Sequence, residues 1–542
     1  APACRRGAAS ASALQTPSGP AGSRHVSAWA RRFDDLNEAA ERGDTPRAEG
    51  LSAGLAGGAP QRPRTLLFNT VLKACANSGA TGRAAMWYGQ MREQRVRVNA
   101  KTFGKLIEAA AKSGNVALAR SWFGRMALEF DVSSVAVNTV IDACAQAGDL
   151  CEAAAWLGRM EASRLGPDEV SYGGVLNACA KAGLAEEARD WLGRMEAAQL
   201  QPNLISYSSV IDACAKAGRS EDAAAWLDRM GRRSIQPDVV SYASVIDAFA
   251  RAGRARDAAR WLGAMQAACL RPNAIAYNSV IAACGRVGHP KKAREWLARM
   301  RAAGLQLSSA SYNGLIDACA TAGKPDEACR CLDEMEAGGI SPDGASYASA
   351  IAACARAGTA PAAAAVFGRM LSASLRPSEV SYNGVINAYG KAKQVDEAVA
   401  WLDKMKSAGV TPSVISYTNI VSAYARLAQA DSAVRWLDAM ETAALRPNVL
   451  TYTSAIEACS GGGPELLELV RGLLQRMLQA TVQPDKVLVA KVSRVWGREA
   501  LGELGPAFQP GERRGLAKSE AELARRLQRV PRPRGPCGTG QA

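Results

Sequence analysis

The polar side chains of this 542-residue chain recur at a fixed spacing of 35 residues. Counting each repeating unit from its first residue, the fifth position holds Asn69, Gly104, Asn138, Gly173, Ser208, Ala243, Asn278, Asn313, Ala348, Asn383, Thr418 and Thr453. The last position holds Asn99, Ser133, Asp168, Asn203, Asp238, Asn273, Ser308, Asp343, Ser378, Ser413, Asn448 and Asp485. Amides, hydroxyls and carboxylates differ in their hydrogen-bond donors and acceptors. Such pairs therefore suit the recognition of a polar edge.

A row of basic residues stands at the thirteenth position of the same units. Its members are Lys112, Lys181, Lys216, Arg251, Arg286, Arg356, Lys391 and Arg426. Such a row suits successive phosphates, each contact adding to affinity and to its salt dependence. The alternative is an ion pair four residues apart, as in Asp212 with Lys216 and Asp247 with Arg251, worth only about 0.2–0.5 kcal/mol. We favour phosphate contact.

The second position is aliphatic in most units. It holds Leu66, Val135, Val170, Ile205, Val240, Ile275, Val380, Ile415 and Leu450, whereas Lys101, Ala310 and Ala345 break the pattern. Residues 2, 5, 9 and 13 of a helix lie along one face, so these aliphatic side chains would share a face with the polar and basic rows. They would wedge between unstacked bases; ordinary helix packing is the alternative.

Catalytic signatures are absent from the sequence. There are two histidines, His25 and His289, and neither a phosphate-cradling G-x-x-x-x-G-K-[ST] nor the H-x-E and P-C-x-x-C of zinc deaminases occurs. Eight of the 14 cysteines share the eleventh position, where other units carry Phe or Tyr, so we expect buried, reduced thiols. Cys329 and Cys331 are too close along one helix to build a zinc site, and no partners are expected. We predict no enzyme, no metal and no cofactor.

The spacing also predicts the elements that position these residues. Residues 204–238 show the pattern of two amphipathic helices. The apolar face of the first consists of Ile205, Val210, Ile211 and Cys214, and that of the second consists of Ala223, Ala224, Trp226, Leu227 and Met230. Ala217-Gly218 separates them as a helix stop, Pro237 closes the unit, and the residue after it is a good N-cap in most units. Each unit is thus an antiparallel helix pair. One pair cannot bury its own apolar faces, but a stack can.

We therefore predict an all-α fold, a right-handed α-solenoid superhelix of about twelve stacked 35-residue antiparallel helix pairs. Residues 65–485 form the array, 1–64 a transit-like disordered leader with a degenerate N-terminal cap, and 486–542 capping helices with a basic disordered tail. The units are 65–99, 100–133, 134–168, 169–203, 204–238, 239–273, 274–308, 309–343, 344–378, 379–413, 414–448 and 449–485.

The repeated pattern resembles the pentatricopeptide repeat family, in its plain-repeat (P-type) subclass. The resemblance rests on V-x-Y-N/S/T-x-V-I-x-A-C-x-K/R-A-G in the first helix, E/D-A in the second and the closing P-D/N. The tetratricopeptide repeat has a period of 34, and its W-x2-L-G-x2-Y signature is absent. The resemblance implies sequence-specific binding of single-stranded RNA along the concave face, one base per repeat, in organellar RNA processing, stabilisation, splicing or translation.

The resemblance also implies roles for the repeated positions. The fifth and last positions would read the base through Asn69 with Asn99, Asn138 with Asp168, Ser208 with Asp238, Asn278 with Ser308, Asn313 with Asp343, Asn383 with Ser413, Thr418 with Asn448, and Thr453 with Asp485. The family's preferences give 5′-Y-N-U-N-G-(A)-C-U-N-C-A-G-3′ along the chain. Gly104, Gly173, Ala243 and Ala348 have no hydrogen-bonding side chain, so their four units are poorly specified. For the last position alone, N-capping is an alternative explanation.

Charge and leader composition bear on partners and location. The net charge is +15, but two basic tails flank a nearly balanced body, and no apolar run approaches a membrane span. Arg and Ser without acids before Asp34 are typical of an organelle transit peptide, with a generic disordered tail as the alternative. We expect a plastid location, with the mitochondrion as the alternative.

We expect a monomer that binds RNA and no membrane. One alternative is a protein scaffold that holds a peptide on the same concave face. A further alternative adds a separate nuclease, splicing or editing factor that the RNA-bound chain would recruit.

Overall fold

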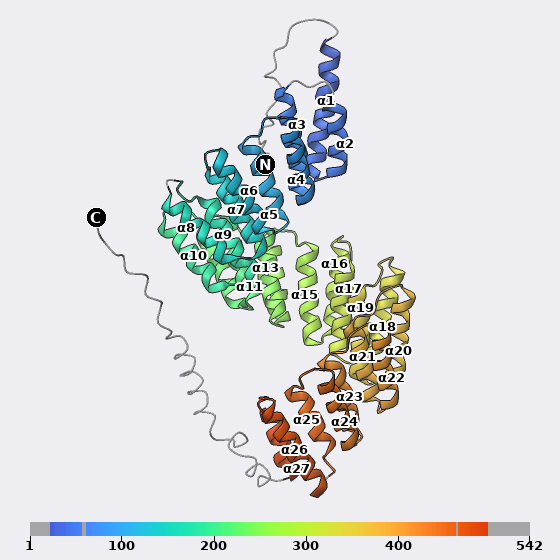
Figure 1. Cartoon of the computed structure of the whole chain (residues 1–542). Helices are drawn as coiled ribbons and strands as arrows, with labels where there is room; N and C mark the ends of the chain where they lie inside the picture. Colours follow the sequence, from blue (N-terminus) through green and yellow to red (C-terminus); the bar gives the residue numbers. More distant parts are fainter. Residues whose placement is uncertain (1–21, 57–60, 164, 462–463, 497–542) are drawn as a thin grey trace, which may run out of the picture. The chain divides into compact units, whose positions relative to one another are not determined.

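The computed structural model describes residues 22–56, 61–163, 165–461 and 464–496, and within these ranges the chain forms 27 helices and no strand (Figure 1). None of the described helices combines the length and apolar character that crossing a membrane requires. The chain divides into two compact units, Ala1–Ala283 and Cys284–Ala542, and helices pack pairwise within each.

The first unit begins with α1 (Gly22–Arg42), α2 (Thr45–Ala56), α3 (Gln61–Ser78), α4 (Thr81–Glu93), α5 (Ala100–Lys112), α6 (Val116–Glu129) and α7 (Ser134–Ala147). It continues with α8 (Leu150–Ala162), α9 (Glu169–Ala182), α10 (Ala185–Ala197), α11 (Leu204–Lys216), α12 (Ser220–Arg232), α13 (Val239–Arg251) and α14 (Ala255–Ala267). Helix α15 (Ala274–Val287) spans the boundary between the units.

The second unit contains α16 (Pro290–Ala302), α17 (Ser309–Thr321), α18 (Pro325–Ala337), α19 (Gly344–Ala357), α20 (Ala360–Ser372) and α21 (Glu379–Lys391). It ends with α22 (Val395–Ser407), α23 (Val414–Arg426), α24 (Ala430–Thr442), α25 (Val449–Ala458), α26 (Pro464–Gln479) and α27 (Lys486–Trp496). The twelve predicted repeats correspond to the pairs from α3 with α4 to α25 with α26.

Local sequence sets the ends of each helix. The last-position residues all stand directly before the first helix of the following pair, where N-caps belong. At the other end of α9, Gly183 has φ +70°, and its N–H reaches the carbonyls of Ala180 and Cys179. This left-handed turn suits glycine. Lys393 and Ala428 adopt it in later repeats with φ of +61° and +53°, a conformation that side chains bearing a Cβ disfavour.

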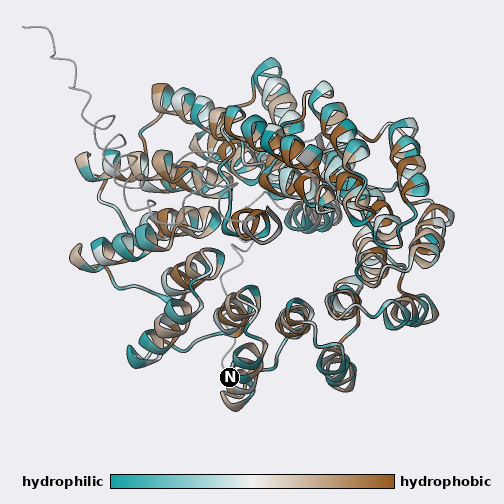
Figure 2. Cartoon of the chain, turned by 90° about the horizontal axis from the view of Figure 1, so that it is seen from below, coloured by the Kyte–Doolittle hydropathy of each residue, from teal (hydrophilic) through white to brown (hydrophobic). Residues whose placement is uncertain are grey.

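The core is built from the same repeated positions in every pair. At least five tyrosines of the fourth position pack on the tryptophan of their own second helix, with ring centroids 6.2 Å apart for Tyr207 and Trp226 and 6.1 Å apart for Tyr417 and Trp436. The repeated methionines, such as Met230 and Met440, are fully buried. Figure 2 shows hydrophobic residues along the helices of both units, with hydrophilic residues between them.

First helices pack on the first helices of neighbouring repeats, as α7 does on α9 and α19 on α21. Two glycines allow this close approach. A Cβ added to Gly174 would lie 2.6 Å from Cγ2 of Ile141, and one added to Gly384 would lie 2.6 Å from Cγ2 of Ile351. The first helices therefore form a continuous row in each unit, and this row carries the second, fifth and thirteenth positions.

Further helices flank the array at both ends. Within the predicted leader 1–64, α1 and α2 form a pair that packs on α3, and the assignment of this segment as a leader with a degenerate cap stays a prediction. The transit-like residues 1–21 lie outside the described residues, as does the basic tail 497–542. Helix α27 covers the last pair, with Leu488 and Val492 buried beside Leu474. The handedness of the superhelix stays a prediction.

Candidate nucleic-acid interface

The second-position aliphatic side chains are exposed. The exposed fraction lies between 58% and 71% for Val135, Val170, Ile205, Val240, Ile275, Val380 and Ile415. Leu66 and Leu450 are exposed as well. Packing within the helix pair therefore does not explain why these positions are aliphatic. Exposed aliphatic side chains at regular intervals suit contact with another flat apolar surface, and a base-wedging role stays a prediction.

The fifth and last positions of one repeat meet in space. In the third repeat, Asn138 Nδ2 donates to Asp168 Oδ1 at 3.0 Å. In the eighth, Asn313 Nδ2 donates to Asp343 Oδ1 at 3.2 Å. In the first, Asn69 Nδ2 lies 3.4 Å from Asn99 Oδ1. Two residues that are 30 positions apart thus form one hydrogen-bonding surface.

A third residue, which the sequence analysis missed, joins each pair. Ser171, the third residue of the fourth repeat, donates to Asn138 Oδ1 and is also 2.7 Å from Asp168 Oδ1. Its backbone N–H donates to the same carboxylate at 2.8 Å, so the cap and the pair share one network. Ser346 takes the same place beside Asn313.

In other repeats too, the third-position hydroxyl forms a hydrogen bond with the fifth-position side chain of the preceding repeat. Thr102 Oγ1 donates to Asn69 Oδ1 at 2.8 Å, Ser208 and Ser241 hydroxyls lie 2.9 Å apart, and Thr418 and Thr451 hydroxyls lie 2.8 Å apart. These third-position residues are buried. A repeated Ser or Thr two residues before the fifth position was the available signal in the sequence.

This network holds the two aspartates in the charged form. Burial raises the pKa of Asp168, but hydrogen bonds from Ser171 and Asn138 outweigh it, so the pKa lies below its usual value of 3.8. The pKa of Asp343 is lowered in the same way, since bonds from Ser346 and Asn313 outweigh the effect of burial. Each site therefore presents a fixed carboxylate acceptor.

The other predicted base-reading residues differ in their exposure to solvent. Thr418, Thr453 and Asn383 are buried, and the Thr453 hydroxyl donates to the Val449 carbonyl at 2.7 Å. Asp485 caps α27 by accepting from the Leu488 N–H at 2.7 Å. Asn278 is half-buried on α15, and Ser308 is exposed before α17. Asn203, Asn273, Asp238, Ser413 and Asn448 all accept bonds from backbone N–H groups as N-caps.

The thirteenth-position side chains reach back to the preceding repeat. Lys216 Nζ donates to the Ala180 carbonyl at 2.8 Å, Arg356 to that of Thr321 at 3.2 Å and Lys391 to that of Arg356 at 3.2 Å. Lys112 Nζ lies 3.4 Å from the Asn77 carbonyl. A positive charge at the carbonyl end of a helix is favourable. This stabilising role was not predicted.

The predicted ion pairs on this face are present in two repeats. Lys216 lies 2.9 Å from Asp212, and Arg251 lies 2.7 Å from Asp247. Lys181, Arg286 and Arg426 are exposed at the same position.

Three neighbouring positive charges lie close together in the second unit. Burial lowers the pKa of Lys391, and the positive charges of Arg426 and Arg356 lower it further. Such a group attracts anions.

On the second helices, several arginines are compensated. Arg194 stacks 3.9 Å from the ring centre of Trp191 and lies 3.4 Å from Glu161 of the preceding repeat. Arg229 likewise stacks over Trp226 and pairs with Glu196. These arginines join successive second helices. The first-helix face is therefore the better candidate for an anionic ligand.

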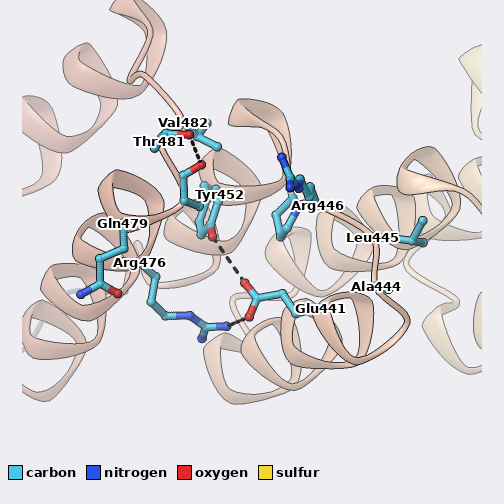
Figure 3. Close-up of a pocket in the computed structure, with 11 residues that line it drawn as sticks. Glu441, Ala444, Leu445, Arg446, Tyr452, Arg476, Gln479, Thr481 and Val482 are labelled. Atoms are coloured by element: carbon cyan, nitrogen blue, oxygen red, sulfur yellow. Dashed lines mark hydrogen bonds and ion pairs between the residues drawn. The ribbon is translucent and has the colours of Figure 1, made fainter.

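A hollow between the last two repeats illustrates the same compensation (Figure 3). Arg476 pairs with Glu441 at 2.8 Å, and the Tyr452 hydroxyl donates to the same carboxylate at 3.4 Å (Figure 3). The hollow is lined by residues from α24, α25 and α26 and from the loops after α24 and α26. Its polar groups bind one another, which is typical of a junction between repeats.

The cysteines of the eleventh position are buried as predicted, namely Cys75, Cys144, Cys179, Cys214, Cys284, Cys319, Cys354 and Cys459. Cys329 and Cys331 lie on α18, the first partly exposed and the second buried, and both have free thiols. Among the described residues, no third ligand completes a metal site.

Comparison with known proteins identifies the repeats. A family model described as the pentacotripeptide-repeat region of PRORP matches residues 133–303. The PPR repeat family matches 307–356, 377–426 and 412–461, and a single PPR repeat matches 67–96. None of the curated proteins compared matches the chain.

Several solved structures are similar to this chain. The pentatricopeptide repeat protein PPR10 from maize is 22% identical, with 91% of this chain and 84% of that chain covered and a TM-score of 0.43. Yeast Rmd9p in complex with a 16-nucleotide target RNA is 11% identical, with coverages of 92% and 96% and a TM-score of 0.32. The PPR domain of Arabidopsis thaliana PRORP1 in complex with tRNA is 20% identical, with coverages of 32% and 90% and a TM-score of 0.28.

The family matches recur from residue 67 to residue 461, and the structure forms a helix pair at each predicted repeat. The chain belongs to the pentatricopeptide repeat family.

Proposed function

We propose that this chain is a non-catalytic protein that binds single-stranded RNA sequence-specifically and assigns one base to each repeat. The observation that carries the proposal is the coincidence of three rows on the first helices. Exposed aliphatic side chains and basic side chains recur at 35-residue spacing, and hydrogen-bonded polar pairs accompany them in the first, third and eighth repeats. These are the groups that a base face, a base edge and a phosphate respectively require.

Each row has one task in this proposal. Val170 and its equivalents lie between successive bases, and pairs such as Asn138 with Asp168 bind the Watson–Crick edge. Lys181, Arg286 and Arg426 are exposed and contact phosphates. Lys216 and Arg251 do so after exchanging their carboxylate partners for phosphate. Because each repeat adds one such set, twelve repeats suit about twelve nucleotides.

We also propose that the protein acts in an organelle, with the plastid ahead of the mitochondrion, and serves RNA processing, stabilisation, splicing or translation. The acid-poor, Arg-bearing leader supports this location. A bound repeat array would block a nuclease or open a hairpin by itself. Recruitment of a separate nuclease, splicing or editing factor is the second possible consequence, and the protein is proposed to act as a monomer.

The test is binding of the full chain to a 12-nucleotide RNA of sequence 5′-YNUNGACUNCAG-3′ and to a scrambled RNA across a salt series. We expect tighter binding to the designed RNA and a fall in affinity with salt for both. The control is the full chain with Asn138→Ala and Asn313→Ala, which should lose at least about tenfold of the preference, since a good base contact is worth ~1–3 kcal/mol.

Two other results would change the proposal. Equal, salt-dependent binding to both RNAs would leave a non-specific RNA-binding protein. Failure to bind either RNA would favour the protein scaffold that holds a peptide on this face.

A further inference from the structure

The first residue of the tenth repeat enters its polar pair. Glu379 begins α21, and its Oε1 accepts from Asn383 Nδ2 at 3.1 Å. The same oxygen accepts a hydrogen bond from the Ser413 hydroxyl. Glu379 therefore joins the fifth and last positions of its own repeat.

The third and eighth repeats show what this contact replaces. There the amide nitrogens of Asn138 and Asn313 donate to Asp168 and Asp343, the last residues of the repeats. The last residue of the tenth repeat is Ser413, and the carboxylate comes from Glu379 instead. The tenth repeat thus resembles an asparagine–aspartate repeat in its chemistry, although its residue pair is asparagine and serine.

The contact also fixes which groups remain for a base. A serine hydroxyl has one proton, and Ser413 donates it to Glu379, so only lone pairs remain. Asn383 Oδ1 is itself buried, and only 7% of Asn383 is exposed, so the Glu379 carboxylate and the lone pairs of Ser413 are the acceptors left for a base. The site therefore presents mainly acceptors.

Uracil and cytosine differ in what they offer to such a site. Uracil carries a donor at N3, whereas cytosine carries an acceptor there. Cytosine carries its own donor at N4, so the discrimination depends on an acceptor that faces N3. A carboxylate in that place gains a hydrogen bond from uracil N3–H and opposes the lone pair of cytosine N3.

We propose that Glu379 is a third base-specifying residue and makes the tenth repeat prefer uracil to cytosine. This inference rests on the proposed RNA binding and deepens it. It replaces the cytosine assigned to Asn383 and Ser413 from the sequence pattern alone. The residue that decides the base lies outside the pair, at the first position of the repeat.

The fourth repeat carries the same residue. Glu169 begins α9, and Asn203 Nδ2 lies 3.5 Å from its Oε2. The fifth position there is Gly173, which brings no polar group. Among the twelve repeats, only the fourth and tenth have an acid at the first position.

The experiment compares two 12-nucleotide RNAs that differ only by U or C opposite the tenth repeat. The full chain should bind the U-containing RNA about tenfold more tightly, the effect of one good base contact. Glu379→Ala should free the Ser413 hydroxyl and move the preference toward C. Glu379→Gln keeps the size of the side chain and removes its charge, so it should reduce the preference for U while circular dichroism remains unchanged.

Two controls separate charge from base choice. Asp142→Ala removes an exposed negative charge from another first helix and should change affinity for both RNAs equally. The seventh repeat has Asn278 and Ser308 with Ala274 at its first position, so the same U-to-C comparison there should favour C.

The outcomes distinguish this inference from the proposed function. Discrimination at the third and eighth repeats, with the same U-to-C ratio for the full chain and Glu379→Ala, would overturn the role of Glu379 alone. Absence of discrimination at every repeat would overturn base reading and this inference together.

Discussion

At the residue scale, the last position of each repeat serves the fold and the candidate interface at once. Asp168 caps α9 through the Ser171 N–H and also accepts from Asn138. Its carboxylate is therefore oriented before any ligand arrives, because the helix terminus holds it. The same arrangement recurs at Asp343. Preorganisation of this kind lowers the entropic cost of binding.

The lowered pKa values of Asp168 and Asp343 predict an acid-sensitive contribution to stability. A folded-state pKa below the usual 3.8 means that the contribution is full above about pH 4 and is lost as the pH falls through the folded-state values. Melting temperatures should fall between pH 5 and pH 3. The Asp168→Asn, Asp343→Asn double variant should have a lower melting temperature at pH 5, and its melting temperature should fall less between pH 5 and pH 3. Equal losses in both proteins would contradict the assignment.

Buried thiols should resist alkylation. Burial raises the pKa of Cys144 and Cys179 to about 12 and that of Cys75, Cys214 and Cys459 to about 11. At pH 8 these thiols are protonated as well as covered. N-ethylmaleimide followed by peptide mass spectrometry should modify the exposed Cys151 and Cys269 first, and the buried five only in urea. Rapid modification of Cys179 in the native protein would contradict the packing.

At the element scale, the first helices determine the interface and the second helices hold it in place. Neighbouring first helices approach closely where glycine stands, as at Gly174 against Ile141. Arginines stacked on tryptophans and paired with acids of the preceding repeat join the second helices. The spacing of the polar pairs thus follows from helix packing.

Adjacent glycines of α9 give a matched pair for testing this packing. Gly174→Ala places a Cβ 2.6 Å from Ile141 Cγ2, so it should destabilise the protein by about 1–3 kcal/mol. Gly173→Ala meets nothing within 4 Å and should stabilise the helix by up to ~1 kcal/mol, the usual preference for alanine. Urea midpoints that shift in the same direction for both variants would contradict the close approach of α7 and α9.

The exposed aliphatic row should matter for binding more than for folding. A triple variant with Val170→Ser, Ile205→Ser and Val240→Ser should alter the free energy of unfolding by less than about 0.5 kcal/mol per site, because these side chains are mostly exposed. RNA affinity should fall at least about tenfold, since apolar burial against bases is lost. Leu128→Ser is the control, as Leu128 is 88% exposed on α6. Equal effects of the control and the triple variant would argue against wedging.

At the scale of the whole molecule, periodic sequence predicted most of the fold. Twelve helix pairs, their N-caps and the buried tyrosine, methionine and cysteine positions follow from local patterns that recur every 35 residues. The contacts between residues far apart in the sequence did not follow, because they depend on how neighbouring helices align laterally. Ser171 beside Asn138, Lys391 at the Arg356 carbonyl and Glu379 beside Ser413 join residues 33 to 35 positions apart. Identical residue pairs can therefore differ in chemistry.

The net charge of the whole chain indicates an anion-binding surface only when the positions of the basic residues are known. The net charge of +15 comes largely from the two ends, and the array is nearly balanced. Second-helix arginines such as Arg194 are paired with acids, while first-helix cations such as Arg356 and Lys391 donate to backbone carbonyls. The salt dependence of RNA binding should therefore depend on the thirteenth position.

The most direct test of one base per repeat exchanges a protein pair and its base together. Asn138→Thr with Asp168→Asn gives the third repeat the residue types of Thr418 and Asn448, and the matching RNA carries A in place of U at the third base. The full chain should prefer U there by at least about tenfold, and the double variant should prefer A, with the other eleven positions unchanged. If both proteins rank the two RNAs in the same order, modular base reading by these pairs is wrong.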